Sequence, residues 1–250
     1  LVRTAPSLAF GVLRTRAALL GQVAPTLISG AEQDAILAEL LSGHEDPSVP
    51  QLPWPTWLPP ETLRLRAFRD ELRDLLMRAA ERGVSPAQLQ ELGVAADRQE
   101  WVAAARLYEE YLDTTALRST VLDVGDRFDP AVIVAEAAHV LINWDNELST
   151  HDRPSWDLVV VDDYHEATAA TVRLLNVLAL GGARVVLLAD PDLATQVYRG
   201  AVPWVVQRAG HPPSDPNSYD GLGAFGAQVV HLDRVWRHGP TIRALAPAIA

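Results

Sequence analysis

Two adjacent carboxylates, Asp162 and Asp163, stand directly after the short apolar run Leu158–Val161. A run of this kind is typical of a buried strand in a parallel sheet, and α/β folds place their ligands at the carboxyl ends of such strands. One carboxylate at that edge can hold magnesium, and the other can orient or deprotonate a water that attacks a γ-phosphate. A helix N-cap or a solvated turn also uses acid pairs, and this motif alone does not decide between the two interpretations.

Composition excludes several other kinds of site. With no cysteine among 250 residues, the chain has no disulfides, no thiolate zinc ligands and no thiol nucleophile. Its seven histidines show no H-x-x-x-H or similar ligand spacing, so a metal ion would have to bind carboxylates. The formal net charge of −11 argues against a protein that coats nucleic acid, so any DNA contact must be local.

All 21 basic residues are arginine, and the chain has no lysine. A phosphate-binding loop of the form G-x-x-x-x-G-K-[ST] needs a lysine ammonium to reach the β- and γ-phosphates of a nucleotide. The sequence therefore predicts that this chain is not a complete nucleotide hydrolase, and that it neither binds nucleotide saturably nor hydrolyses ATP by itself.

The elements around the carboxylate pair predict an α/β sheet. A helix is expected over 167–180, a second buried strand within 183–192 and a third within 227–237. Strands that alternate with helices in this way are typical of a parallel sheet.

The middle third of the chain predicts helices instead. Apolar residues recur at helical spacing, and a proline-rich connector at 44–62 interrupts them. The predicted helices cover 31–43, 63–83, 85–92, 99–117 and 129–142. No run approaches the roughly 20 apolar residues needed to cross a bilayer, so we expect a cytoplasmic protein with no membrane association.

The segment around the two carboxylates, WDLVVVDDYHEAT, resembles the Walker B segment of UvrD/Rep-type superfamily-one DNA helicases, an apolar strand followed by Asp-Glu-x-Gln-Asp. The match runs from Val159 to Glu166. The resemblance implies that Asp162 holds Mg²⁺ and that Asp163, one methylene shorter than the family's Glu, is the catalytic base. His165 takes the place of the family's Gln, and these two substitutions can impair hydrolysis.

The next segment, VVLLADPDLATQVYRGA, resembles the family's strand, Gly-Asp-Pro-Asp-Gln and aromatic-Arg-Gly-Ala motif at preserved spacing. This resemblance implies that Asp190 lies in the nucleotide site. It implies also that Tyr198 and Arg199 bind DNA, with the aromatic ring stacked on a base. Leu193 replaces the Gln that senses phosphate in the family.

Two weaker resemblances lie near the ends of the chain. VVHLDRVWRHGPTI is similar to the segment that opens the second motor domain, which implies that Trp236 stacks on adenine and that Arg237 reaches the γ-phosphate. An ordinary arginine at a strand edge is the alternative for Arg237. RTAPSLAFGVL is similar to the family's Thr-x-His-Ser segment, which implies contacts of Thr4 and Ser7 with single-stranded DNA, although Pro6 replaces the His.

The order of these segments implies an incomplete RecA-like P-loop NTPase sheet, of α/β class, with a largely helical insertion. We expect 1–12 and 154–227 to belong to the first motor domain, 13–153 to be the insertion and 228–250 to begin the second motor domain. The family resemblance implies an ATP-dependent 3'-to-5' DNA helicase or translocase of repair and recombination. Its cofactors would be ATP and Mg²⁺, and its partners single-stranded DNA and duplex ends.

The insertion adds a finer resemblance. RLRAFRDELRDLLMRAAERGVSP, joined to EWVAAARLYEEYLD, looks like the AdnA-type subunit of actinobacterial AdnAB helicase-nucleases, which resect double-strand breaks. It implies a heterodimer with a second helicase-nuclease subunit.

Other interpretations stay open. The VVVDDY segment also resembles the acid pair of a response-regulator receiver, although that chemistry needs a lysine near the phosphoryl site. A degenerate motor that holds DNA or a partner without turning over ATP is consistent with the substitutions at Asp163, His165 and Leu193. The tryptophans Trp54, Trp57 and Trp101 either form a partner-docking surface or belong to the core, as aromatic residues usually do.

Overall fold

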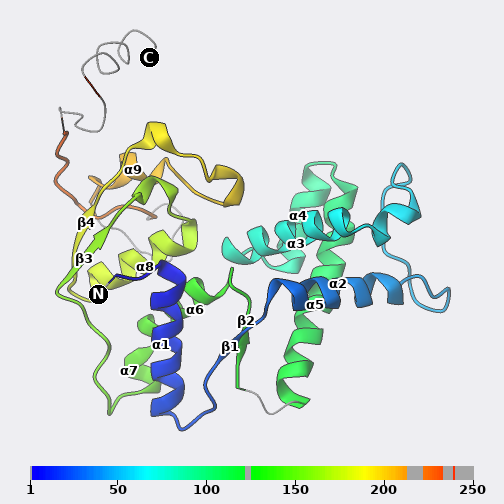
Figure 1. Ribbon diagram of the computed structural model, residues 1–250, viewed down its shortest axis with the longest axis horizontal. Helices are drawn as coiled ribbons and strands as arrows, with labels where there is room; N and C mark the ends of the chain where they lie inside the picture. The colour runs from blue at the N-terminus through cyan, green and yellow to red at the C-terminus, as the bar shows by residue number, and fades with distance from the viewer. Residues whose placement is uncertain (1, 122–124, 213–221, 233–238, 240–250) are drawn as a thin grey trace.

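The computed structural model describes residues 2–121, 125–212, 222–232 and 239, which form two lobes side by side (Figure 1). The sheet lobe, as we call it, contains α1 (Ala5–Leu19), α6 (Ile133–Ile142), α7 (Trp144–Glu147), β3 (Leu158–Val161), η2 (Tyr164–Glu166), α8 (Ala169–Leu180), β4 (Arg184–Leu187), η3 (Pro191–Leu193), η4 (Val197–Arg199) and α9 (Val205–Arg208). The helical lobe contains α2 (Gly30–Gly43), η1 (Pro60–Arg64), α3 (Arg66–Glu81), α4 (Pro86–Ala95) and α5 (Gln99–Val121). Where the chain passes between the lobes, β1 (Thr26–Leu27) pairs in parallel with β2 (Arg127–Phe128).

Local capping signals delimit the helices of the helical lobe. The Ser29 hydroxyl accepts a hydrogen bond from the Glu32 amide at the start of α2, and Ser85 forms a capping box with Gln88 at the start of α4. Beyond the end of α3, Gly83 has a φ of +70°, a conformation that glycine adopts without strain. The apolar faces of α2, α3 and α5 then close on one core, which includes Ile36, Leu37, Leu72, Leu76, Leu107 and Tyr111.

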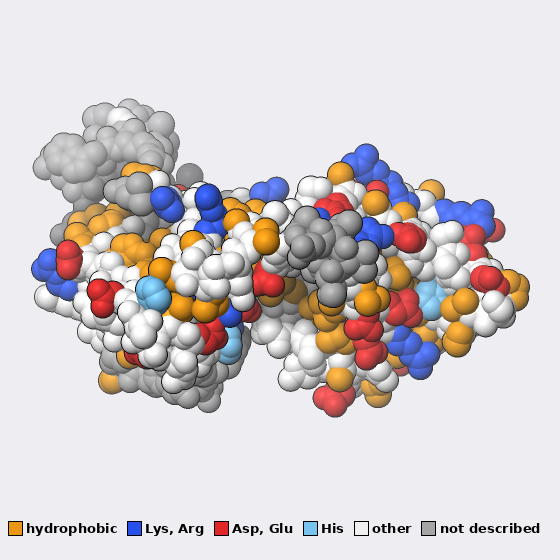
Figure 2. All heavy atoms as spheres, turned by 90° about the horizontal axis from the view of Figure 1, so that it is seen from below, with side chains coloured by type: hydrophobic (Ala, Val, Ile, Leu, Met, Phe, Trp, Pro, Cys, Tyr) orange, Lys and Arg blue, Asp and Glu red, His pale blue; other side chains and the backbone are white. Residues whose placement is uncertain are grey.

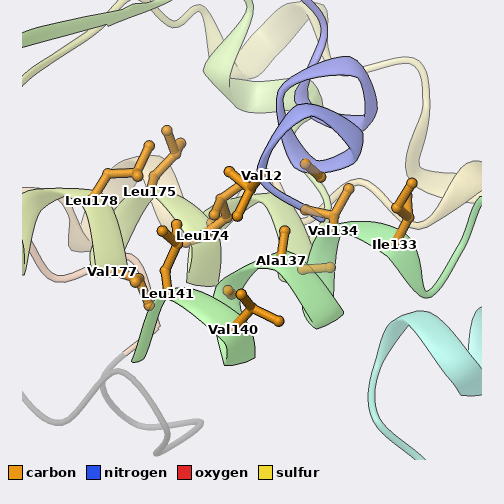
Figure 3. Packing of buried hydrophobic residues seen from close by; sticks show 14 of the residues in the cluster. Val12, Ile133, Val134, Ala137, Val140, Leu141, Leu174, Leu175, Val177 and Leu178 are labelled. Atoms are coloured by element: carbon orange, nitrogen blue, oxygen red, sulfur yellow. The ribbon is translucent and has the colours of Figure 1, made fainter. Parts of the chain in front are cut away.

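The core of the sheet lobe centres on α6. This helix packs against both α1 and α8, as Figure 3 shows for Val12 of α1, Val134 and Leu141 of α6, and Leu174 of α8. Ala137 is fully buried on α6 and lets the neighbouring helices approach closely. The three helices therefore form one packed layer, and side chains of the strands pack against it.

The sheet that carries the carboxylate pair has two strands in the described part of the chain. β3 and β4 run parallel, with Val159 opposite Val185 and Val161 opposite Leu187. Val159, Val161 and Leu187 pack against the helical layer. The opposite face is apolar but open, and Val160 on it is 57% exposed. Parallel sheets are normally covered on both faces, whereas this sheet has one covered and one exposed apolar face.

The predicted helices and the first two predicted strands are confirmed to within a few residues at their ends. The third strand, predicted within 227–237, is wrong where the structure describes it, because 227–232 is irregular and pairs with no described strand. Its apolar side chains Val229, Val230 and Leu232 are exposed, so they have no packed surface that would hold them in a sheet. The rest of that segment lies outside the described residues.

Residues 13–19 of α1 and the whole of α6 and α7 pack in the sheet lobe. The boundaries expected for the motor domains and the insertion, at 12/13, 153/154 and 227/228, stay a prediction. The architecture is a mixed α/β one with short parallel sheets and many helices. Among the residues that the structure describes, no helix is both long and apolar enough to span a membrane.

A buried polar network lies where the chain leaves the helical lobe. The Asp129 Oδ1 accepts hydrogen bonds from Gln33 Nε2 at 2.6 Å and from the Tyr111 hydroxyl at 2.9 Å, which ties together α2, α5 and the entry to α6. Burial raises the pKa of Asp129, and the hydrogen bonds from Gln33 and Tyr111 oppose that rise. Nearby, Arg127 pairs with Glu32 at 2.6 Å. Charged and amide side chains therefore fix the geometry of this junction.

Candidate functional site

The carboxylate pair lies at the carboxyl edge of the two parallel strands, as predicted. Beyond β3 and β4 the pairing continues, since the Leu188 amide donates to the Val161 carbonyl at 2.8 Å and the Tyr164 amide donates to the Leu188 carbonyl at 2.9 Å. Asp163 has a φ of +50°, in the left-handed region that acidic residues tolerate better than most, and it turns the chain sharply. Asp162 and Asp163 are both exposed, and Asp162 Oδ1 accepts from the Asp163 amide at 3.1 Å.

His165 connects this edge to the loop after β4. Its side chain is only 4% exposed, and its Nδ1 accepts a hydrogen bond from the Asp190 amide at 3.0 Å. A ring nitrogen that accepts carries no proton, so this hydrogen bond selects the neutral imidazole tautomer with its hydrogen on Nε2. The structure thus brings Asp162, Asp163, His165 and Asp190 together, with His165 beneath the edge rather than on it.

Glu166 is a residue that motif reading missed as part of the site. Its carboxylate accepts from the Thr195 amide at 2.7 Å, from the Thr195 hydroxyl at 2.9 Å and from the Gln196 amide at 2.9 Å. The hydrogen bond from the Thr195 amide is the largest cause of a lowered Glu166 pKa, because it stabilises the charged form. The sequence could have indicated Glu166 only as the acid at the end of the Asp-Asp-Tyr-His-Glu segment. Glu166 therefore holds the start of the next loop.

That loop presents an aromatic ring and a cation to solvent. Tyr198 is 71% exposed, and the Arg199 guanidinium lies 5.3 Å from the centroid of its ring. Gly200 follows with a φ of +96°, and Ala201 returns to the core through an antiparallel bridge to Thr168. An exposed aromatic ring beside an arginine is the kind of surface on which nucleic-acid bases stack.

The remaining predicted site residues are Thr4, Ser7, Trp236 and Arg237, of which the structure describes Thr4 and Ser7. Thr4 Oγ1 accepts from the Ser7 amide at 3.3 Å and caps α1, and both residues are exposed. Within the described residues, no hydrogen bond or ion pair joins Thr4 or Ser7 to Tyr198 or Arg199. Trp236 and Arg237 lie outside the described residues.

The carboxylate edge offers the kind of ligands with which nucleotide-hydrolysing enzymes bind magnesium. No group of three or more His, Cys, Asp or Glu side chains gathers as a metal site in the described part of the chain. Mg²⁺ commonly takes one or two carboxylates and completes its shell with waters and substrate phosphates. The exposed pair Asp162 and Asp163 fits that donor set.

Tyr164, which lies between Asp163 and His165 in the sequence, has a buried hydroxyl that is unsatisfied within the described residues. The side chain is 1% exposed, and its ring packs edge-on to Phe225 with centroids 6.3 Å apart. Its hydroxyl oxygen has no hydrogen-bond partner among the residues that the structure describes, and burial raises the pKa of Tyr164. A buried hydroxyl without a partner costs free energy.

We therefore expect Tyr164→Phe to raise the free energy of unfolding by about 1 kcal/mol, because the ring stays and the unpaired hydroxyl is removed. The matched control is Tyr111→Phe, whose hydroxyl donates to Asp129 and whose loss should lower stability by a similar amount. Urea titration of both variants measures the difference. Equal destabilisation by the two substitutions would contradict the expectation.

A pocket of about 380 Å³ lies in the helical lobe, away from the carboxylate edge. It is lined by Leu41, His44, Glu45, Gln51, Leu52, Trp54, Pro60, Glu61, Leu63 and Arg64.

Trp54 packs edge-on to Phe68 at 5.3 Å, and Trp101 packs against the same core, whereas Trp57 is exposed. Two of the three tryptophans singled out in the sequence thus belong to the core. On the side of the molecule seen in Figure 2, arginines are scattered among acidic side chains and form no continuous basic surface.

A model described as the UvrD/REP helicase N-terminal domain matches residues 1–213. No curated protein matches the chain.

Proposed function

This chain belongs to the UvrD/REP helicase N-terminal domain family, and from that premise we propose that its β3–β4 edge is the ATP-hydrolysing edge of a DNA helicase motor. In general, the family supplies ATP-dependent DNA helicases, which use ATP and Mg²⁺ and bind DNA. The observation that carries the proposal is the joining of the two strand ends through His165 and Asp190, which sets Asp162 and Asp163 at an exposed carboxyl edge.

At this edge, Asp162 would hold the magnesium ion that neutralises phosphate charge when nucleotide is bound. Asp163 lies next to it and would orient or deprotonate the attacking water. Asp190 follows β4 at the same edge, and the hydrogen bond from its backbone amide to His165 Nδ1 links the two loops. Trp236 and Arg237 would contribute adenine stacking and γ-phosphate contact from the second motor domain.

The DNA-binding side of the proposal rests on the loop that follows. Tyr198 would stack on a base and Arg199 would neutralise a phosphate, a combination that binds single strands without sequence preference. Thr4 and Ser7 would add polar contacts to the strand from the first turn of α1.

The open face of the sheet supports a larger RecA-like domain. Leu158, Val160 and Val186 are exposed there, and an isolated two-stranded parallel sheet is not stable by itself. Because this sequence contains no lysine, we propose that further strands, one of them followed by the phosphate-binding loop, complete the sheet in the intact helicase. ATP turnover would then require those strands.

The finer biological role is also a proposal. The likeness of the helical lobe to AdnA-type subunits favours 3'-to-5' translocation, double-strand break processing in the cytoplasm and a second helicase-nuclease subunit as partner. A non-catalytic motor that holds DNA or a partner is the second candidate. It is favoured by the burial of His165, whose ring nitrogen is used by the Asp190 amide instead of the nucleotide site.

The intact helicase distinguishes the two candidates. We expect its ATP hydrolysis to rise several-fold when single-stranded DNA is added, and we expect it to unwind duplexes with a 3' tail but not a 5' tail. Steady-state ATPase assays and strand-displacement assays measure both properties. DNA binding without stimulated hydrolysis would support the scaffold instead.

A further inference from the structure

The two lobes meet at the loop that presents Tyr198 and Arg199. Gly200 is buried, and a Cβ placed on it would lie 2.8 Å from Glu81 Oε2 and still closer to Arg78 Nη1. Arg78 and Glu81 belong to the last turn of α3 in the helical lobe. Figure 1 shows the yellow segment of the sheet lobe reaching toward that end of α3. The backbone of the loop is therefore seated directly on an ion pair of the other lobe.

This ion pair is partly shielded from water, since the Arg78 side chain is 31% exposed and the Glu81 side chain is nearly buried. Arg78 Nη1 lies 2.7 Å from Glu81 Oε2, the Glu81 side chain is 10% exposed, and Nη1 itself is buried. The nearly buried Glu81 carboxylate is less screened by solvent than a carboxylate of a surface pair, and removal of Arg78 would leave its charge without this partner. The loop therefore lies against a partly buried ion pair of α3.

The loop is held at two points, and the exposed side chains stand between them. At its start, Glu166 of the sheet lobe binds the amides of Thr195 and Gln196. At its end, Gly200 lies against Arg78 and Glu81. The Gly200 φ of +96° lets the backbone make this approach, which a side chain would block.

We propose that the Arg78–Glu81 pair is a positioning device by which the helical lobe holds the Tyr198–Arg199 loop in its DNA-binding conformation. The pair lies against the Gly200 backbone, so it would act on DNA binding through the loop. Movement of the helical lobe relative to the sheet lobe then changes how tightly the loop engages single-stranded DNA. The DNA-binding part of this inference rests on the proposed function, whereas the holding of the loop does not.

Hydrogen exchange in the intact helicase without DNA tests the holding of the loop. The amides of Arg199, Gly200 and Ala201 donate to carbonyls within the loop at 2.8 to 3.1 Å, so their exchange reports its opening. We expect Arg78→Ala to speed their exchange about fivefold or more and Arg78→Lys to restore part of the protection. Arg82→Ala is the matched control, because Arg82 is exposed at the end of the same helix. Unchanged exchange in Arg78→Ala would overturn the inference.

DNA-stimulated ATP hydrolysis tests the consequence. We expect Arg78→Ala to raise the half-saturating concentration of an oligothymidylate about fivefold while the maximal rate changes less than twofold. Glu81→Gln, which keeps the shape of the side chain, should give the same pattern if Arg78→Ala does not fold. If Tyr198→Ala raises this concentration and the Arg78 and Glu81 variants do not, the coupling is overturned. If Tyr198→Ala itself has no effect, the failure belongs to the proposed DNA contact, and the exchange result decides the positioning role.

Discussion

Replacement of Asp162 by Ala in the intact helicase is expected to lower the rate of ATP turnover by roughly a hundredfold or more, since the charge stabilisation supplied by a bound metal is worth several kcal/mol and each 1.36 kcal/mol changes the rate tenfold. Asp162 is exposed at the carboxyl end of β3, and its carboxylate already faces the Asp163 amide. Its removal should disturb the fold little.

The matched control is Asp157→Ala, because Asp157 is an exposed carboxylate at the opposite end of the same strand. It should leave turnover within about twofold of the wild type, as surface substitutions usually do. The rates at saturating DNA and MgATP, together with a Mg²⁺ titration, make the comparison. If both variants keep full activity, hydrolysis takes place elsewhere and the proposed role of this edge is wrong.

Replacement of Asp129 by Ala is expected to lower the free energy of unfolding by about 2–4 kcal/mol, because the buried Gln33 amide and Tyr111 hydroxyl lose their acceptor. Asp129→Asn keeps an oxygen in the same place and is neutral. It should therefore be about as stable as the wild type at neutral pH, or more stable, because no charge has to be buried.

The pH dependence of that comparison has a defined sign. Because burial raises the folded-state pKa of Asp129 above its ordinary value of 3.8, the folded chain holds this proton more tightly than the unfolded chain. The contribution of Asp129 to stability is fully present below the unfolded-state pKa and is lost as pH rises through the folded-state pKa. Asp129→Asn should remove this loss.

Urea titrations of the wild type and both variants over the acidic to neutral range measure these effects. The stability advantage of Asp129→Asn over the wild type should grow as pH rises from the ordinary carboxyl range and then become constant. Destabilisation by Asn as large as that by Ala would show that the charge, rather than the acceptor oxygen, stabilises the junction.

The features of this protein that depend on local pattern can be predicted from its amino-acid sequence. An apolar run of four residues followed by two acids predicted β3 and an exposed carboxylate edge, and both are found. Apolar residues at helical spacing predicted the helices of the helical lobe, and the caps at Ser29 and Ser85 in the structure agree with them. These predictions succeed because backbone propensity, capping and periodicity act over a few neighbouring residues.

The tertiary structure alone decided which residues serve as supports. Nothing local indicates that His165 is buried against the Asp190 amide, that Glu166 holds Thr195 and Gln196, or that Gly200 lies against α3. Residues 227–232 show that local preference can also fail, since these strand-forming residues have no surface to pack on and stay irregular. Contacts between residues far apart in the chain depend on how whole layers pack, and a single sequence states the preferences of its segments but not their final neighbours.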